Sequence, residues 1–167
     1  MSPTTTGQPD VPEGYGVGRD GHLLDWSTVE ARLVESLHYW MSTVRSDGRP
    51  HVVPRWGVWL DEQFWYDGSP ETRHAINLRS NPACALHLES GSDVAILEGV
   101  SLPSDPVSGE LGERLSAEYI GKYAEHGYSP GPASWSDEIA GGLRIFTPRT
   151  AVAWSSFPTD LTRFSFD

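Results

Sequence analysis

The sequence predicts a mainly β protein with flanking helices, an α+β fold in which six to seven short antiparallel strands form a closed or half-closed barrel. Three observations lead to this prediction. Short apolar segments with a period of two dominate the middle of the chain, turn residues separate them, and only two or three segments have helical spacing. Closure of the sheet is expected because it removes exposed strand edges.

The chain has 167 residues, 38% of them hydrophobic and 11% aromatic, which is enough for one buried core. Residues 1–20 are rich in Pro, Gly and Thr and lack a period, so we expect a flexible N-terminal arm, or a strand that orders only against the body. Residues 21–167 are expected to form a single domain. No apolar run approaches the ~20 residues that span a bilayer, and the N-terminus does not resemble a signal peptide. We therefore expect a cytoplasmic protein without membrane contact.

The charge balance limits the ligands that the chain can bind. Twelve Lys and Arg against 23 Asp and Glu give a net charge of -11, which argues against nucleic-acid binding. An anionic ligand must therefore meet local cations. The single cysteine, Cys84, lies between apolar neighbours and predicts a buried, unreactive thiol. The six histidines form no tight cluster and no HExxH motif, so no metal site is expected.

The first helix is expected at residues 25–36, where Ser27 and Glu30 fit a capping box before an apolar period of helical spacing. Three strands in a meander should follow. The turn Asp47-Gly48 is typical of a hairpin between the first two of them, and "DEQ" supplies the next turn. These strands are expected at residues 37–44, 51–60 and 64–68.

The segment "DGSPETRHAINLRSNP" predicts a short helix. Ser69 is placed to cap it and Pro70 fits the first helical position, where a missing N–H has no cost. The helix should stop at Asn81-Pro82, because the residue before proline avoids the α region.

The first turn of this helix carries Thr72, Arg73 and His74 beside backbone N–H groups that have no helical partner. A hydroxyl, a guanidinium and an imidazole at this position favour binding of an anion, particularly phosphate. The alternative is a capped surface helix whose Arg73 pairs with a surface carboxylate.

The second half of the chain should contain a hairpin buried on both faces, a helix, a loop and two more β segments. The loop, residues 127–142, forms either an ordered rim or a lid. Lys122 and Tyr123 at the end of the helix either reach a cofactor cleft or simply complement the helix dipole. The expected bounds are 83–89 and 94–102 for the hairpin, 109–126 for the helix, 142–157 for a last hairpin and 161–166 for a terminal strand.

The strand at residues 51–60 contains Arg55, Trp56 and Gly57. Glycine weakens a strand unless a partner needs to approach the backbone closely, and a flat ring is one such partner. Pro54 makes a bulge plausible. Trp59 is expected to pack in the core or in a dimer interface.

The motif "TVRSDGRPH" followed by "NLRSNP", within this order of elements, resembles the pyridoxamine 5'-phosphate oxidase-like family of split-barrel flavin and deazaflavin oxidoreductases. The resemblance covers roughly residues 22–166. It implies a six-stranded antiparallel split β-barrel of the FMN-binding type, and a homodimer with the cofactor cleft at its interface. It further implies hydride transfer between bound FMN or coenzyme F-420 and a small unsaturated organic substrate. The alternative is a non-catalytic or regulatory flavin- or haem-binding protein of the same fold.

The resemblance also assigns residues to the cofactor. His74 stands where the family usually has lysine, and histidine is only partly charged near neutral pH, so it should hold a phosphate weakly unless Arg73 or Arg55 compensates. No catalytic acid or base is expected, because positioning contributes most of a hydride transfer. Pyridoxamine phosphate oxidation itself is disfavoured, because the C-terminal third offers only Arg144, Arg149 and Arg163 for a second phosphate. The assigned residues are Arg55, Trp56 and Gly57 at the ring, Thr72, Arg73 and His74 at the phosphate, and Trp154 or Arg163 from the closing strands or the second subunit.

Overall fold

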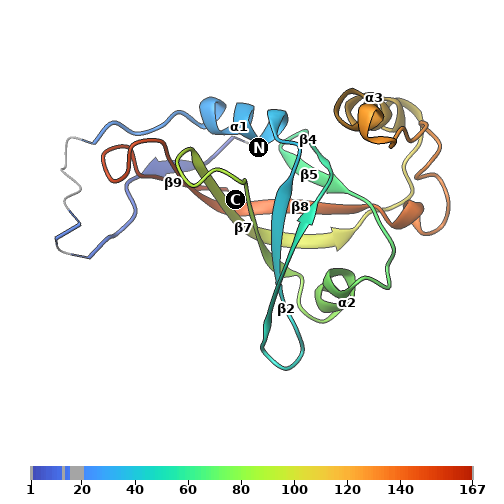
Figure 1. The fold of residues 1–167 in the computed structure, drawn as a ribbon, viewed down its shortest axis with the longest axis horizontal. Coiled ribbons are helices and arrows are strands. Elements are labelled where there is room, and N and C mark those ends of the chain that lie inside the picture. The colour runs from blue at the N-terminus through green and yellow to red at the C-terminus, as the bar shows by residue number, and fades with distance from the viewer. Residues whose placement is uncertain (1, 13, 16–20, 167) are drawn as a thin grey trace.

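The computed structural model describes residues 2–12, 14–15 and 21–166, and it is mainly antiparallel β with flanking helices, as predicted (Figure 1). Across these residues nine strands form one sheet that is not closed, so the expected six-stranded barrel is wrong in both respects. The helices are α1 (Trp26–Glu35), α2 (Arg73–Ser80) and α3 (Gly109–Tyr123), with 3-10 turns at Ala124–His126 and Ala140–Gly142. The strands are β1 (Thr5–Gly7), β2 (Tyr39–Val44), β3 (Pro50–Arg55), β4 (Val58–Leu60), β5 (Gln63–Tyr66), β6 (Ala83–His87), β7 (Val94–Pro103), β8 (Arg144–Trp154) and β9 (Thr162–Ser165).

The strands run in the order β1-β9-β8-β7-β6-β2-β3, with the β4–β5 hairpin attached to β8. β8 pairs with β7 along one edge, and its other edge pairs first with β5 and then with β9. The last hairpin expected at residues 142–157 is therefore a single strand. Pro148 does not end it, because the register with β7 shifts between Glu98 and Gly99 and a proline fits at such a bulge.

The expected three-strand meander is also wrong. β2 pairs with β3 and β4 pairs with β5, but the chain leaves the sheet at Trp56 and Gly57 between the two hairpins. The β6–β7 hairpin has the predicted position but is not buried on both faces: Ile96 and Glu98 point outward and are exposed. The reason is that the described helices leave this outward face of the sheet uncovered in a single chain.

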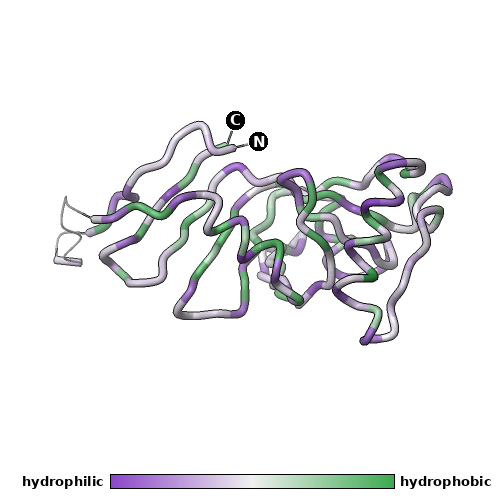
Figure 2. The backbone as a smooth tube through the Cα atoms, turned by 90° about the horizontal axis from the view of Figure 1, so that it is seen from above, coloured by the Kyte–Doolittle hydropathy of each residue, from purple (hydrophilic) through white to green (hydrophobic). Residues whose placement is uncertain are grey.

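Helix α1 begins at Trp26 with Asp25 as its N-cap residue, and no side chain caps it, so the predicted capping box does not form. Glu30 instead accepts a hydrogen bond of 3.0 Å from the indole Nε1 of Trp59. This places Trp59 in the core, in line with the expected packing. Hydrophobic and hydrophilic residues are interspersed along the tube in Figure 2. In β2 the buried residues 39, 41 and 43 alternate with more exposed ones, which gives the sheet one core face and one outward face.

Two hydrophobic cores lie in this fold. The first lies between α1 and the sheet, and the second between α3, the β4–β5 hairpin and residues 127–142 (Figure 1). The first contains Val29, Leu33, Tyr39, Met41, Phe64, Leu97, Phe146 and Phe164, and the second contains Val58, Trp65, Leu115, Tyr119, Tyr123, Trp135 and Leu143.

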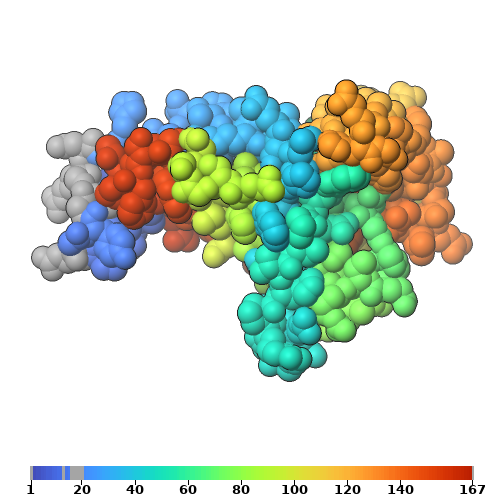
Figure 3. Space-filling model, in the orientation of Figure 1, coloured from blue at the N-terminus to red at the C-terminus, as the bar shows by residue number. Residues whose placement is uncertain are grey.

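Residues 127–142 form an ordered rim on the second core, one of the two expected alternatives. Trp135 is fully buried, and the hydroxyl of Ser116 donates a 2.7 Å hydrogen bond to the carbonyl of Pro130. Of the N-terminal arm, Thr5–Gly7 pairs with β9, while residues 13 and 16–20 lie outside the described residues. In the space-filling view the β2–β3 hairpin projects from the body beside α2 (Figure 3). None of the described helices is both long enough and apolar enough to span a membrane.

Candidate cofactor and ligand site

Helix α2 begins at Arg73 with Thr72 as its N-cap residue, not at Pro70 as predicted. The preceding residues form a turn in which the Thr72 amide donates to the Ser69 carbonyl at 3.2 Å. The predicted end is confirmed, because the helix stops at Ser80 before Asn81-Pro82. The amide of Asn77 donates to the hydroxyl of Thr43 at 2.9 Å and anchors α2 against β2. The start of α2 therefore lies next to the ends of β3 and β5.

His74 faces inward from the first turn of α2 and is only 4% exposed. Its Nε2 lies 3.3 Å from the hydroxyl of Thr72, and its ring centroid lies 6.2 Å from that of Tyr66. Burial lowers the pKa of His74 to about 4, and the charge of Arg55 acts in the same direction. The imidazole is therefore neutral at pH 7 and adds no charge to a phosphate site, which goes beyond the partial charge expected from the sequence.

Two arginines remain as cations near the start of α2. Arg55 donates from Nη2 to the carbonyl of Asp67, and its guanidinium carbon lies 5.5 Å from the centroid of the Tyr66 ring. Its buried Nε has no hydrogen-bond partner in the described structure. Arg73 is exposed, and no hydrogen bond or ion pair within the described residues occupies it. Both guanidinium groups can therefore bind an anion.

Trp56 lies beside Arg55 where the chain leaves the sheet, and its side chain is 37% exposed. Its ring stacks on Tyr123 with centroids 4.9 Å apart and planes at 16°. A shallow cavity of about 320 Å³ opens here, and we call it the tryptophan cavity. It is lined by Pro54, Arg55, Trp56, Asp67 and Tyr128.

The two residues at the end of α3 differ in their roles. Tyr123 forms one wall of the Trp56 stack, so it reaches the candidate site as one alternative expected. Lys122 instead donates to the carbonyl of Ser36 and to the hydroxyl of Tyr39, each at 2.9 Å. Lys122 therefore ties α3 to the segment before β2 and does not face the cavity.

Gly57 is required for a different reason from the one predicted. It is buried, and a Cβ at this position would overlap the carbonyl oxygen of Trp65 and lie 2.5 Å from the ring of Phe64. Its N–H donates to the hydroxyl of Tyr123 at 3.0 Å, and that hydroxyl lies 2.8 Å from its carbonyl. Glycine therefore allows this turn of the chain to pack closely on β5, and its backbone is buried there.

Trp154 and Arg163 do not join the other assigned residues within one chain. Trp154 pairs with Val94 and its ring contacts Phe157, while Arg163 pairs with Val152 and Gly7. They belong to the end of the sheet that carries β9, away from α2 (Figure 1). Both point to the outward face of the sheet, so only a second chain could bring them to the tryptophan cavity.

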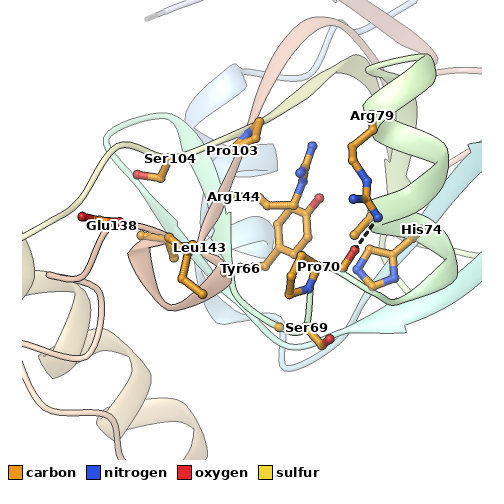
Figure 4. Close-up of a pocket in the computed structure, with 14 residues that line it drawn as sticks. Tyr66, Ser69, Pro70, His74, Arg79, Pro103, Ser104, Glu138, Leu143 and Arg144 are labelled. Atoms are coloured by element: carbon orange, nitrogen blue, oxygen red, sulfur yellow. Dashed lines mark hydrogen bonds between the residues drawn. The ribbon is translucent and has the colours of Figure 1, made fainter.

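A second cavity of about 310 Å³ lies across the segment 67–70 from the first, between α2, β5, β8 and residues 138–143. We call it the arginine pocket, because Arg79 and Arg144 both line it (Figure 4). Tyr66 and His74 complete the same side. The sequence alone does not single out Tyr66 or Arg79 for this site, because the pairing of Tyr66 with Arg144 depends on the register of β5 with β8.

Cys84 is buried as predicted, and burial raises the pKa of its thiol to about 12. A thiol with this pKa is unreactive near neutral pH. In the described part of the chain, no three His, Cys, Asp or Glu side chains gather as a metal site.

An open antiparallel sheet with α2 laid against β2 and β3 defines an α+β protein of the split-barrel class. The sequence model of the pyridoxamine 5'-phosphate oxidase family matches residues 27–140, more than half of the chain. The chain therefore belongs to the pyridoxamine 5'-phosphate oxidase family. No curated protein matches it.

Solved structures share this fold at low sequence identity. An F420 reductase is 20% identical with a TM-score of 0.51, over 84% of this chain and 98% of its own. A conserved hypothetical protein from Mycobacterium tuberculosis is 19% identical with a TM-score of 0.60, over 83% and 88%. A heme binding protein from Mycobacterium smegmatis is 14% identical with a TM-score of 0.62, over 86% and 60%. At these identities the likeness concerns the fold alone.

Proposed function

We propose that this protein binds FMN or coenzyme F-420 at the tryptophan cavity and the adjoining start of α2, and that it acts as a cytoplasmic oxidoreductase. The proposal rests on two adjacent residues at this cavity. Arg55 has a buried Nε without a hydrogen-bond partner in the described structure, and the ring of Trp56 beside it is half exposed. A buried donor without a partner is costly, and an anionic ligand would remove that cost. Bound flavin or deazaflavin would supply the hydride chemistry for a small unsaturated organic substrate.

The residues of this chain would divide the work of binding. Arg55 and Arg73 would hold the phosphate, because their charges do not depend on the neutral His74. Thr72 would lie beside it, with its hydroxyl donating to the carbonyl of Ser69 at 2.9 Å. Trp56, whose other face stacks on Tyr123, would pack against the flat ring of the cofactor and exclude water from it. No acid or base is needed from the protein, since orientation is its main contribution to such a transfer.

We also propose that two copies pack through the outward face of the sheet. This face carries exposed apolar side chains, among them Val44 (41% exposed), Val52 (50%) and Ile96 (36%). Apolar side chains on neighbouring strands favour an interface with another chain. Trp154 and Arg163 belong to the same face, so the second copy could bring them to the cofactor.

A non-catalytic flavin- or haem-binding role is the second candidate. The neutral His74 favours it, because a phosphate at this site has one cation fewer than in relatives with lysine. Haem carboxylates could pair with Arg55 and Arg73, which do not depend on the charge of His74.

The test is titration of the purified protein with FMN, F-420 and haem in separate experiments, followed by absorbance and fluorescence. We expect one of the first two to bind tightly, and we expect Arg73→Ala and Arg55→Gln to weaken it by roughly tenfold while the fold is kept. Arg49→Gln at the exposed β2–β3 turn, where Arg49 pairs with Asp47, is the matched control. Tight binding of haem alone would replace the oxidoreductase with the second candidate, and unchanged affinity in both variants would remove these arginines from the site.

A further inference from the structure

The arginine pocket is separate from the tryptophan cavity and has its own charged side chains. Its two arginines come from different elements: Arg79 from the last turn of α2 and Arg144 from the first residue of β8. The segment 67–70 separates it from Trp56 and Arg55. A ligand in this pocket would therefore leave the tryptophan cavity open.

Arg144 is the unusual residue of this pocket, because it is a cation that is only 8% exposed. It donates from Nη2 to the carbonyl of Ser101 at 2.9 Å and from Nε to the hydroxyl of Ser101 at 3.4 Å. No ion pair with a carboxylate is found for it within the described chain. Buried charges in proteins are normally paired with an opposite charge, so the neutral partners of Arg144 leave its charge uncompensated.

Among the described residues, neutral polar groups, not carboxylates, surround Arg144, which favours binding of an anion. The hydroxyl of Tyr66 lies 2.7 Å from the hydroxyl of Ser101, so donors gather around the guanidinium. Arg79 donates a 3.0 Å hydrogen bond from Nη2 to the carbonyl of Pro70, which is drawn as the dashed line in Figure 4. That single bond holds its guanidinium at the rim of the pocket and leaves its other N–H groups for a ligand.

The remaining walls define the rest of the ligand. Pro70, Pro103 and Leu143 are apolar, and they face the same cavity as the two arginines. Glu138 also lines the pocket, but Figure 4 shows it beside Ser104 and Leu143, on the side away from Arg79 and His74. The cavity is therefore cationic at one side and mainly apolar elsewhere, with one exposed carboxylate at its outer rim. A volume of about 310 Å³ suits a small molecule.

We propose that the arginine pocket binds a small organic oxyanion, a carboxylate or a phosphate monoester with an apolar body, at a site separate from the cofactor. Arg144 and Arg79 bind the anionic group, and Pro70 and Leu143 contact the body. The pocket adjoins the start of α2, which supplies His74 to its lining, but Arg79 and Arg144 take no part in the proposed cofactor site, so this proposal does not need the oxidoreductase function.

The experiment is calorimetric titration of the full chain, without cofactor, with benzoate, phenyl phosphate, inorganic phosphate and benzyl alcohol. We expect benzoate or phenyl phosphate to bind about tenfold or more tightly than benzyl alcohol, which lacks the charge. The tighter of the two anions identifies the group that the pocket takes. Arg144→Gln and Arg79→Gln should each weaken binding about fivefold or more, and Arg49→Gln should not. Arg144 is buried, so Arg79→Gln at the rim gives the result even when Arg144→Gln fails to fold.

Five results would overturn the proposal. The first four are no binding of either organic anion, equal binding of benzyl alcohol, inorganic phosphate binding as tightly as phenyl phosphate, and unchanged affinity in folded Arg79→Gln. The fifth is competition: FMN or F-420, where one binds, should leave the affinity for the organic anion unchanged, and displacement would merge the two sites. Failure of the chain to bind any cofactor leaves this result intact, so the two proposals fail separately.

Discussion

Acid should destabilise this protein through His74 before it protonates most of the carboxylates. The pKa of this imidazole is lowered from 6.5 to about 4 in the folded chain, first by burial and then by the charges of Arg55, His51 and Arg144. Above pH 6.5 the group is neutral in both folded and unfolded chains and has no effect. Between pH 6.5 and about 4 the unfolded chain binds a proton that the folded chain does not, so the stability falls as the pH falls.

The size of this loss follows from the two pKa values of His74, 6.5 and about 4. The difference corresponds to at most about 3 kcal/mol of unfolding free energy. Salt screens the three neighbouring charges, so we expect about 2 kcal/mol at ordinary ionic strength.

The assay is urea unfolding from about pH 7 down to about pH 4.5, for the wild-type chain and for His74→Gln. The stability of the wild type should fall more steeply with acid than that of the variant, by the amount given above. His38→Gln is the matched control, because His38 is a partly exposed histidine with its Nδ1 3.5 Å from a carboxylate oxygen of Glu89. Parallel pH profiles for the wild type and His74→Gln would show that protonating His74 costs the folded chain no free energy, and the reasoning would be refuted.

Three further predictions concern single side chains. Tyr123→Phe should lower the unfolding free energy by about 1–3 kcal/mol in urea unfolding, because the buried N–H of Gly57 loses its partner. Tyr15→Phe, at an exposed ring, should leave the stability unchanged, and equal stabilities of the two variants would contradict the prediction. Gly142→Ala should lower the unfolding free energy by about 2–4 kcal/mol in thermal unfolding, because its φ is positive and its Cβ would overlap the carbonyl of Gly68. Gly131→Ala in the same loop has open space around its Cβ and is the control, and equal melting temperatures of the two variants would show that the rim can shift. Val52→Asp should convert the proposed dimer to a monomer in sedimentation, and a wild-type monomer at micromolar concentration would remove the interface.

The predictable parts of the fold are those that depend on neighbours in sequence. The end of α2 follows from Asn81-Pro82 alone, because the steric restriction before proline is local. The start of α2 does not, since Ser69 and Thr72 can both cap a helix. The contact of Gly142 with Gly68 fixes the chain just before the helix, and this contact joins segments far apart in sequence.

The continuity of strand β8 also could not be predicted from neighbours in sequence. Read locally, Pro148 separates two strands, because proline cannot donate to a ladder. The bulge that accommodates it depends on the register against Glu98 and Gly99 of β7. Gly57 was likewise recognisable as a special position, but the Phe64 ring and the Trp65 carbonyl that require it come from β5.

The candidate site was predictable in part. Arg55 and Trp56 are adjacent in sequence, and the structure places them together at one cavity. The charge state of His74 could not be predicted, because burial and the nearby Arg55 and Arg144 arise only when β3, α2 and β8 assemble. The arginine pocket could not be predicted for the same reason.

The continuity of β8 determines which parts of the chain can exist on their own. Phe146 of this strand belongs to the first core, and Leu143, just before it, belongs to the second. The strand also supplies the backbone partners of β5, β7 and β9. A fragment cut before Leu143 would therefore remove Leu143 from the second core and Phe146 from the first, and it would leave β5 and β7 with unpaired edges. The two cores form one cooperative unit, and a deletion meant to isolate either cavity would unfold both.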